Sequence, residues 1–342
     1  MSGPATIIGP HHPFVKDFSA ALAKVGVRRG DRVIAAVSGG SDSVALLLAL
    51  HALVPQKRWL IDLHVGHVHH HLRPEAEDEQ QLVQDLCAGL AVPCHIADVY
   101  PGEADQNLEA AARSLRYEQL GKLAQRLQAD FVATAHHADD QLETMLMRLI
   151  RGTSIRGLGS MRPSRPMVTG PARLIRPLLG TDRQAMANLL QEVGQRHVHD
   201  ASNDQTDRWR AAIRHRVLPA LKELRSDAAV KAAEAARRLQ EAQDLLESLV
   251  DRHRHLIRPR DNGFDAPRRP LRELHPVLRG ELIRSACLET GAGADSLPGR
   301  LLDTIVEAIG REEPTVRRFD LSGCVLLEIG PETVVWSVVK RS

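Results

Sequence analysis

The first part of the chain alternates short apolar segments with longer amphipathic ones, and this alternation limits the fold more than any other feature. Apolar segments of strand length occupy residues 32–37, 60–65, 92–99 and 130–135. Segments with apolar side chains at helical spacings of three and four lie between them, at residues 41–53, 75–90 and 108–127. Strands that alternate with helices predict an α/β domain with a doubly wound parallel sheet. Ligands of such sheets bind beyond the carboxyl ends of the strands, so the turns there are candidate sites.

The rest of the chain predicts a connector and a second domain. Residues 226–257 lack Gly and Pro and are rich in Ala, Leu, Glu and Arg, which favours one long helix. A polar stretch rich in Pro follows at 258–270, then a helical pattern at 271–309 and strands within 315–339. We therefore expect a helical connector and a smaller C-terminal α+β domain. The expected divisions are a flexible N-terminus at residues 1–13, a catalytic domain at 14–221, and the long helix with the C-terminal domain at 222–342.

Neither a membrane nor an oxidising compartment is indicated by the sequence. No apolar stretch approaches the roughly 18 uncharged residues that a membrane span needs. Residues 1–13 lack the basic and then apolar order of a secretory signal. The four cysteines are scattered and form no CxxC pair. We expect a cytoplasmic protein without a membrane partner.

Positive charge is concentrated in one segment, although the whole chain carries a formal net charge of only +2. Residues 148–216 contain thirteen Arg, no Lys and five acidic residues, which gives a net charge of +8. Arginine without lysine suits bidentate contacts with phosphate, as in nucleic-acid interfaces. A solvated, salt-bridged surface explains the same pattern equally well, so charge alone leaves both interpretations open.

A glycine turn interrupts the apolar run of residues 32–50. Its members are Ser38, Gly39, Gly40, Ser41, Asp42 and Ser43. Free amides at the start of a helix, beside glycines that let an anion approach, suit a phosphate group. A Walker-type loop is excluded because no Lys follows the glycines. Asp42 would repel a phosphate unless a cation lay between them, so it indicates Mg²⁺ bound with a nucleotide. The alternative is an ordinary capped helix.

A second candidate site follows the apolar segment at 130–135, in the sequence HHADDQLET. Asp140 and Glu143 are three residues apart on one face of the expected helix, and His136 stands at the tip of the strand. Clustered carboxylates beside a phosphate site require a cation, either Mg²⁺ or an ammonium group. The alternative, compensation of the helix dipole by acidic residues, explains Asp140 well and His136 poorly.

A third motif, NLEAAARSLRY at residues 107–117, carries two arginines on a helical face beside small residues. Arg113 and Arg116 are expected to reach phosphate from this face. A surface pair between Glu109 and Arg113, one helical turn apart, is about as consistent with the pattern.

The motifs together resemble a known family. The turn SGGSDS resembles the SGGxDS loop of the N-type ATP pyrophosphatases, the PP-loop superfamily, which cleave ATP between the α and β phosphates. Within that superfamily the chain is similar to the tRNA(Ile)-lysidine synthetases, which attach lysine to an anticodon cytidine. The matching motifs are at residues 67–74, 107–117, 133–144, 175–179 and 200–203. This resemblance extends from about residue 32 to residue 221 and implies an adenine nucleotide alpha hydrolase-like sheet.

The resemblance also implies substrates and roles. ATP, Mg²⁺, L-lysine and a tRNA(Ile) with a CAU anticodon are expected, and a homodimer is possible. The implied catalytic residues are Asp42, His136, Asp140 and Glu143, with Asp42 and Asp140 as Mg²⁺ ligands. The implied ATP-binding residues are Ser38, Gly39, Gly40, Ser41, Asp42, Ser43 and His70. The implied lysine or tRNA contacts are Arg113, Arg116, Arg151, Arg210 and Arg214. The lysine ammonium is then the alternative cation for the carboxylates.

Two positions depart from the family pattern. His71 stands where members usually have Gly, and Ala211 stands where they usually have Asn after an Arg. The alternating histidines at 67, 69 and 71 could suggest a metal site, but the resemblance favours a nucleotide-contacting loop.

Two other functions are open. A tRNA thiolase of the same superfamily would need paired cysteines for an iron–sulfur cluster, and Cys87 and Cys94 stand too far apart in the sequence for that pairing. A non-catalytic, nucleotide-gated RNA-binding protein would fit if the two departures reflect lost activity.

Overall fold

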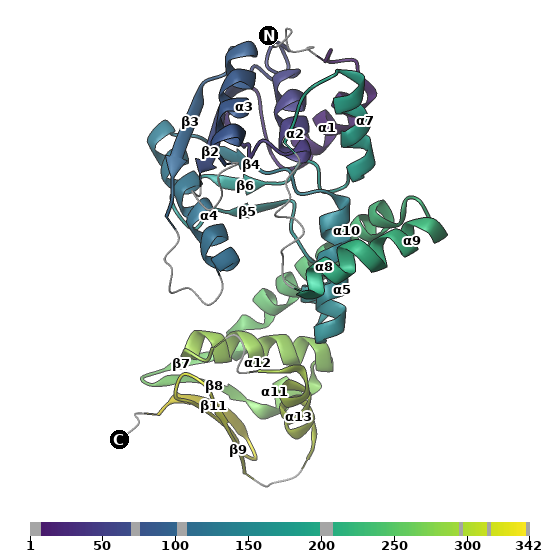
Figure 1. Cartoon of the computed structure of the whole chain (residues 1–342). Coiled ribbons are helices and arrows are strands. Elements are labelled where there is room, and N and C mark those ends of the chain that lie inside the picture. Colours follow the sequence, from purple (N-terminus) through teal and green to yellow (C-terminus); the bar gives the residue numbers. More distant parts are fainter. Residues whose placement is uncertain are drawn as a thin grey trace. The chain divides into compact units, whose positions relative to one another are not determined.

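The computed structural model describes residues 8–69, 76–100, 108–198, 208–293, 297–312 and 316–339 (Figure 1). The chain divides into two compact units. The first comprises residues 1–152 and 158–237, and the second comprises residues 153–157 and 238–342. The expected domain boundary between residues 221 and 222 stays a prediction.

The first unit is built on a six-stranded sheet with the order β3-β2-β1-β4-β6-β5. The strands are β1 (Arg32–Ala36), β2 (Asp62–His69), β3 (Cys94–Asp98), β4 (Phe131–Ala133), β5 (Ser164–Pro166) and β6 (Arg173–Ile175). The first five in that order pair in parallel, and β5 joins β6 in antiparallel fashion at the edge. The predicted doubly wound parallel sheet is therefore confirmed, with one antiparallel strand added.

Helices cover both faces of this sheet. They are α1 (Pro13–Lys24), α2 (Ser41–His51), α3 (Ala76–Gly89), α4 (Leu108–Leu127) and α7 (Arg183–Glu192). The helices α5 (Ala138–Arg151) and α9 (Leu218–Leu224) share a separate core, and α8 (Arg208–Ala212) lies against α5. Side chains of a strand alternate between faces. Val33 and Ala35 of β1 accordingly join one core with α1, α2, α3 and α7, whereas Ile34 joins a second core with α4. Figure 1 shows α4 on the opposite side of the sheet from α2 and α7. The predicted helices α2, α3 and α4 are confirmed to within two residues at each end.

The long helix expected within residues 226–257 is α10 (Ala228–His253), and a 3₁₀ turn, η3 (Arg254–Leu256), follows it. The short helix α6 (Ile155–Leu158) begins in the second unit, where Arg156 lies 3.2 Å from Glu247. The prediction of one long helix is confirmed, since α10 lies within the expected range.

The second unit contains a five-stranded antiparallel sheet with the order β7-β8-β11-β10-β9. Its strands are β7 (Arg258–Arg260), β8 (Gly263–Pro267), β9 (Arg317–Leu321), β10 (Val325–Ile329) and β11 (Thr333–Val338), and its helices are α11 (Arg268–Glu273), α12 (Pro276–Thr290) and α13 (Gly299–Gly310). The predicted α+β class is confirmed. The polar stretch at 258–270 contributes two strands. Pro259 is tolerated there because β7 lies at the edge, where a missing amide donor breaks no central pairing.

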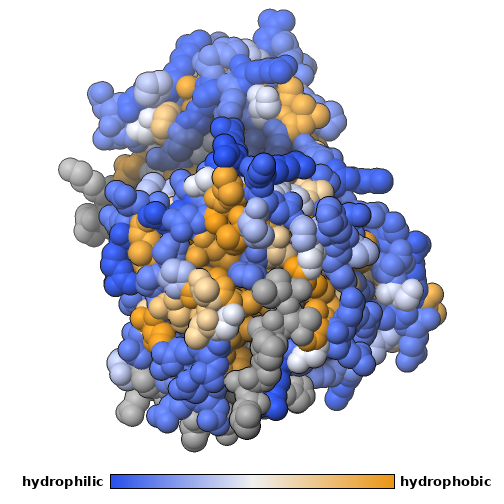
Figure 2. All heavy atoms as spheres, turned by 90° about the horizontal axis from the view of Figure 1, so that it is seen from above, coloured by the Kyte–Doolittle hydropathy of each residue, from blue (hydrophilic) through white to orange (hydrophobic). Residues whose placement is uncertain are grey.

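Among the described residues, no helix is both long enough and apolar enough to cross a membrane. Hydrophilic side chains cover most of the face in Figure 2, and apolar ones gather on it in separate groups.

Candidate active site

The glycine turn connects the carboxyl end of β1 to the start of α2. The amide of Val198 donates to the Gly39 carbonyl at 3.0 Å, and Ser43 Oγ donates to the Gly40 carbonyl at 2.9 Å. Gly39 has a φ of +94°, a conformation that favours glycine, and Gly40 is the N-cap of α2. No side chain of the described residues caps this helix. The first amides of α2 are therefore available to an anion.

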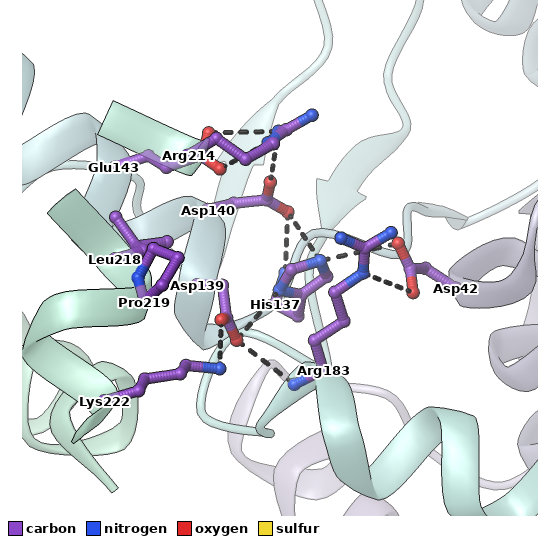
Figure 3. A pocket seen from close by; sticks show the side chains of 10 residues that line it. All are labelled: Asp42, His137, Asp139, Asp140, Glu143, Arg183, Arg214, Leu218, Pro219 and Lys222. Atoms are coloured by element: carbon purple, nitrogen blue, oxygen red, sulfur yellow. Dashed lines mark hydrogen bonds and ion pairs between the residues drawn. The ribbon is translucent and has the colours of Figure 1, made fainter. Parts of the chain in front are cut away.

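A second turn meets the glycine turn because β4 is the parallel neighbour of β1, and both turns leave the same edge of the sheet. His137 is the N-cap of α5, directly after β4, and its ring is almost wholly buried. Its Nε2 lies 3.4 Å from Asp42 Oδ2 and 3.6 Å from Asp140 Oδ2. The backbone amide of His137 also donates to Asp140 Oδ2 at 3.1 Å. One histidine thus joins the two predicted carboxylates (Figure 3).

Asp139 contacts the other ring nitrogen of His137. One of its carboxylate oxygens lies 3.6 Å from His137 Nδ1 and accepts the Arg183 amide at 3.1 Å. The other oxygen pairs with the ammonium of Lys222, which comes from α9. The side chain of Arg183 in turn lies 3.9 Å from Asp42. Segments distant in sequence therefore supply the cations that balance these acids.

Glu143, one turn further along α5, is held by two arginines. Arg214 donates from Nε to Oε1 at 2.6 Å and from Nη2 to Oε2 at 3.0 Å, and Arg210 Nε donates to Oε2 at 3.1 Å. Arg214 belongs to the π-helical segment η2 (Ile213–Val217) between α8 and α9. A π-helical turn shifts the helix register locally, and such turns are frequent at functional sites.

These residues line a pocket with a volume of about 330 Å³ (Figure 3). The lining consists of Asp42, His137, Asp139, Asp140, Glu143, Arg183, Arg214, Leu218, Pro219 and Lys222. A pocket of this volume lies in the range that small-molecule sites usually occupy. Its charges of both signs suit a zwitterionic or phosphorylated ligand better than an apolar one.

The electrostatics of the pocket centre on His137. Burial alone lowers the pKa of its imidazole, but the carboxylates of Asp140, Asp139 and Asp42 outweigh burial and raise it to about 10. The pKa of each carboxyl shifts down in spite of burial, mainly because of His137. At neutral pH, His137 is therefore a cation among three anions.

His136, the predicted catalytic histidine, is not among the residues that line this pocket. Its Nδ1 lies 2.9 Å from Thr134 Oγ1. Burial lowers the pKa of His136 to about 3; Asp140 opposes this, whereas Arg176 and Arg113 add to it. His136 is accordingly neutral at neutral pH, and its catalytic role stays a prediction.

The structure brings some predicted residues together and leaves others apart. Asp42, Asp140, Glu143 and Arg214 share the pocket, and Arg210 reaches it through Glu143. Arg113 and Arg116 are exposed on α4, and Arg151 is exposed at the end of α5. The predicted ATP contact His70, the departure His71 and the motif at 200–203 lie outside the described residues, as does the side chain of Glu109. Ala211 lies in α8, directly after Arg210.

Six pocket residues were missed by the sequence-based prediction: the apolar Leu218 and Pro219, and the charged His137, Asp139, Arg183 and Lys222. His137 and Asp139 are in the quoted motif, and the N-cap position directly after a strand was the available signal. Nothing in the local sequence marks Arg183 or Lys222, because Arg183 begins α7 and Lys222 lies within α9, and the positions of both helices depend on tertiary packing.

The pocket offers carboxylates to a cation. No group of three or more His, Cys, Asp and Glu side chains among the described residues is arranged to hold a metal ion. Asp42 and Asp140 nevertheless face the same point, the position of His137 Nε2. One or two carboxylates, with phosphate oxygens and waters, are the usual ligands of nucleotide-bound Mg²⁺. This donor set therefore fits Mg²⁺ that arrives with a nucleotide.

Comparison with protein families gives one match that covers most of the chain. Residues 10–221 match the PP-loop domain. Among solved structures, the U34-tRNA thiolase of Methanococcus maripaludis aligns over 67% of this chain and 78% of its own, with a TM-score of 0.55 and 16% identity. That likeness indicates a shared fold.

Several relatives are named tRNA(Ile)-lysidine synthase. The one from Bacillus subtilis is 37% identical over 65% of this chain and 47% of its own length. The one from Symbiobacterium thermophilum is 41% identical over 65% of this chain and 46% of its own length. The one from Geobacter sulfurreducens is 34% identical over 91% of this chain and 66% of its own length. The resemblance inferred from the motifs is confirmed, although the chain spans about half the length of the first two relatives.

Proposed function

Because the chain belongs to the PP-loop family, which implies ATP binding, we propose that it is an ATP-dependent ligase that joins lysine to a tRNA. The reaction is the one that the relatives' names describe, lysidine formation on tRNA(Ile). The target is C2 of the wobble cytidine in a CAU anticodon. The observation that carries the proposal is the 3.4 Å approach of Asp42, from the glycine turn, to His137, which also faces Asp140. A nucleotide loop and an acidic pocket are thereby continuous.

The proposed chemistry has two steps. The C2 oxygen of the cytidine attacks the α-phosphorus of ATP, a P–O bond forms, and pyrophosphate leaves. The ε-amine of lysine then attacks C2 of the adenylated base, a C–N bond forms, and AMP leaves with the oxygen. The free amides of α2 and the glycine turn bind the phosphates and hold the α-phosphorus in position.

Asp42 and Asp140 would hold Mg²⁺ that enters with the nucleotide. The ion would neutralise charge on the departing pyrophosphate. His137 is already a cation at this point, so it orients both carboxylates before the nucleotide binds. We expect the amides of the turn, His137 and Arg183 to share the stabilisation of negative charge.

The lysine amine must be neutral to attack, so a group of the protein or the departing phosphate takes its proton. Burial and two nearby arginines keep the pKa of His136 low, and His137 is already protonated. The carboxyls of Asp42, Asp139 and Asp140 also have lowered pKa values, so the phosphate of the departing AMP is the better proton acceptor.

The arginine-rich segment supports RNA as the partner. A wobble base lies in a single-stranded loop and can be turned out of its stack, which is how RNA is usually read with sequence specificity. Arg210 and Arg214 hold Glu143, so we infer that they shape the pocket for lysine and that the more exposed arginines contact RNA. A homodimer and a cytoplasmic location stay predictions.

The thiolase alternative has less support. The thiols of Cys87 and Cys94 lie close enough for each to shift the pKa of the other, because the turn after α3 returns the chain to the start of β3. The expectation that these cysteines are too far apart to pair was therefore wrong. The first unit has only these two cysteines, whereas four thiolates usually hold an iron–sulfur cluster.

The test is ATP-dependent transfer of labelled lysine to unmodified tRNA(Ile) with a CAU anticodon, with tRNA(Met), which shares that anticodon, as the control. Incorporation into tRNA(Ile) alone is expected. Cleavage of ATP to AMP without lysine transfer would support the adenylation step and show that lysine is not the substrate of the second step. No RNA-dependent ATP cleavage would favour a non-catalytic RNA-binding protein.

A further inference from the structure

A cluster of three arginines surrounds Tyr117, on the side of the sheet that α4 covers. The Arg113 guanidinium lies 5.3 Å from the centre of the Tyr117 ring and donates to its hydroxyl at 3.3 Å. The Arg165 guanidinium, from β5, also lies 5.3 Å from the ring centre. Arg176, just after β6, interacts electrostatically with the Tyr117 hydroxyl. Helix α4 and two strands thus bring three positive charges to one aromatic ring.

These three charges have no acidic partner within the part of the chain that the structure describes. Arg176 donates instead to the Arg162 carbonyl at 2.7 Å, and Arg165 donates to the Pro166 carbonyl at 3.3 Å. The acidic pocket, in contrast, balances every carboxylate with a cation. Like charges held around one ring repel each other, so this arrangement is most stable when an anion lies among them.

Arg176, the buried member of the cluster, has a hydrogen-bond donor without an acceptor. Arg176 is 5% exposed, and its Nε–H is buried without a hydrogen-bond partner. Unsatisfied buried donors are rare in folded proteins and call for an explanation such as an absent ligand. Arg113 is exposed and Arg165 is half-buried, so an anion can reach the cluster from solvent.

We propose that Arg113, Arg165 and Arg176, held around Tyr117, form a binding site for a phosphate group outside the acidic pocket. Three guanidiniums offer planar, charge-assisted donors that match phosphate oxygens. Two sources carry this chemistry, the RNA backbone and the polyphosphate of ATP. The aromatic ring beside the arginines favours RNA, because nucleic-acid grooves combine basic side chains with stacking surfaces. Only the assignment to RNA rests on the proposed function.

The test measures two affinities without turnover. Binding of a labelled tRNA anticodon stem-loop is followed by fluorescence anisotropy over a range of salt, and binding of ATP with Mg²⁺ is followed by calorimetry without RNA. The variants are Arg165→Gln, which removes one charge, and Arg176→Lys, which keeps the charge and loses the planar fork. Arg126→Gln, an exposed site near the end of α4, is the matched control.

If the site binds an RNA phosphate, Arg165→Gln weakens the affinity for the stem-loop by about tenfold. It also lowers the slope of log affinity against log salt by about 0.7, the value for one lost contact with a single strand. ATP affinity stays unchanged, as does RNA affinity in Arg126→Gln. A tenfold loss of ATP affinity instead would support the phosphate site and assign it to the nucleotide.

Unchanged affinity for both ligands in Arg165→Gln and Arg176→Lys would overturn the proposal, as would an equal loss in Arg126→Gln. If Arg176→Lys does not fold, Arg165→Gln decides alone. The lysine-transfer assay on the native chain is run in parallel. Its failure would remove the proposed reaction but leave both binding results valid, because neither requires lysine or catalysis.

Discussion

Arg214 holds Glu143 through two parallel hydrogen bonds, with Nε 2.6 Å from Oε1 and Nη2 3.0 Å from Oε2. The Glu143 side chain is 2% exposed, and Arg210 adds a third contact. Burial lowers the pKa of Arg214, but Glu143, Asp140 and Asp42 raise it further than burial lowers it. The pair therefore fixes the turn between α8 and α9 onto α5, and with it one wall of the pocket.

Removal of the Glu143 charge should destabilise the first unit. Glu143→Gln leaves two arginines partly buried without their carboxylate, so we expect a loss of about 3 kcal/mol in the free energy of unfolding. Urea unfolding followed by tryptophan fluorescence measures it. The control is Glu118→Gln, which breaks only the exposed pair with Lys122 and should cost no more than about 0.5 kcal/mol. Equal losses of unfolding free energy in the two variants would mean that the Glu143–Arg214 pair does not fix the segment between α8 and α9 onto α5.

The stability of the first unit should fall at alkaline pH. The pKa of His137 is raised from 6.5 to about 10 in the folded chain, so its stabilising charge is fully present below pH 6.5 and is lost as the pH rises through 10. His137→Gln should cost about 2 kcal/mol near pH 6.5. That difference from the native chain should shrink toward zero above pH 10.

The measurement is thermal unfolding of both proteins from pH 6 to 11, without Mg²⁺ or ATP. The variant corrects for every other group that titrates in this range. A difference that stays constant over the whole range would contradict the charged state assigned to His137. At the acid end, the lowered pKa values of Asp42 and Asp140 predict that their stabilisation persists to below the ordinary carboxyl range.

Two adjacent glycines should respond differently to alanine. Gly39 has a φ of +94°, which an alanine adopts at a cost of about 1–2 kcal/mol. Gly40 has a φ of −71° and a ψ of 159°, which alanine adopts freely, and its added methyl group would meet only Ser38 Oγ at 3.7 Å. Gly39→Ala should therefore weaken ATP binding and lower stability more than Gly40→Ala. Similar effects in both variants, by calorimetry and urea unfolding, would show that the turn tolerates other conformations.

Loss of the Asp42 charge should stop the first chemical step. Asp42→Asn should lower pyrophosphate release by about a hundredfold or more, while tRNA binding stays largely intact. Asp62→Asn, which alters an exposed carboxylate paired with Arg32, is the control and should leave release unchanged. If Asp42→Asn lost pyrophosphate release and tRNA binding together, its assignment to the nucleotide site would be wrong.

Much of the first unit could be predicted because its signals are local. The β1 strand, the glycine turn and α2 each follow from spacing and from the conformational freedom of glycine, which depend on neighbouring residues alone. The position of Asp140 one turn before Glu143 is likewise a property of helix geometry. The motifs then identified the family, since each is a short, contiguous string.

The contacts between those residues depend on the tertiary structure. His136 and His137 are adjacent in one motif, and only the packing of β4 beside β1 places His137 against Asp42. Cys87 and Cys94 pair because a turn reverses the chain between α3 and β3. Edge strand β7 forms around Pro259 because β8 offers a partner, a contact that no local pattern contains.

Local sequence signals were therefore enough to predict the order of elements, the phosphate-binding turn and the family. The charge state of His137, the grip of Arg210 and Arg214 on Glu143, and the cluster around Tyr117 came from the tertiary structure alone. The physical reason is that electrostatic energy depends on distance and burial in space. Side chains that are far apart along the chain acquire both only when the sheet brings their turns together.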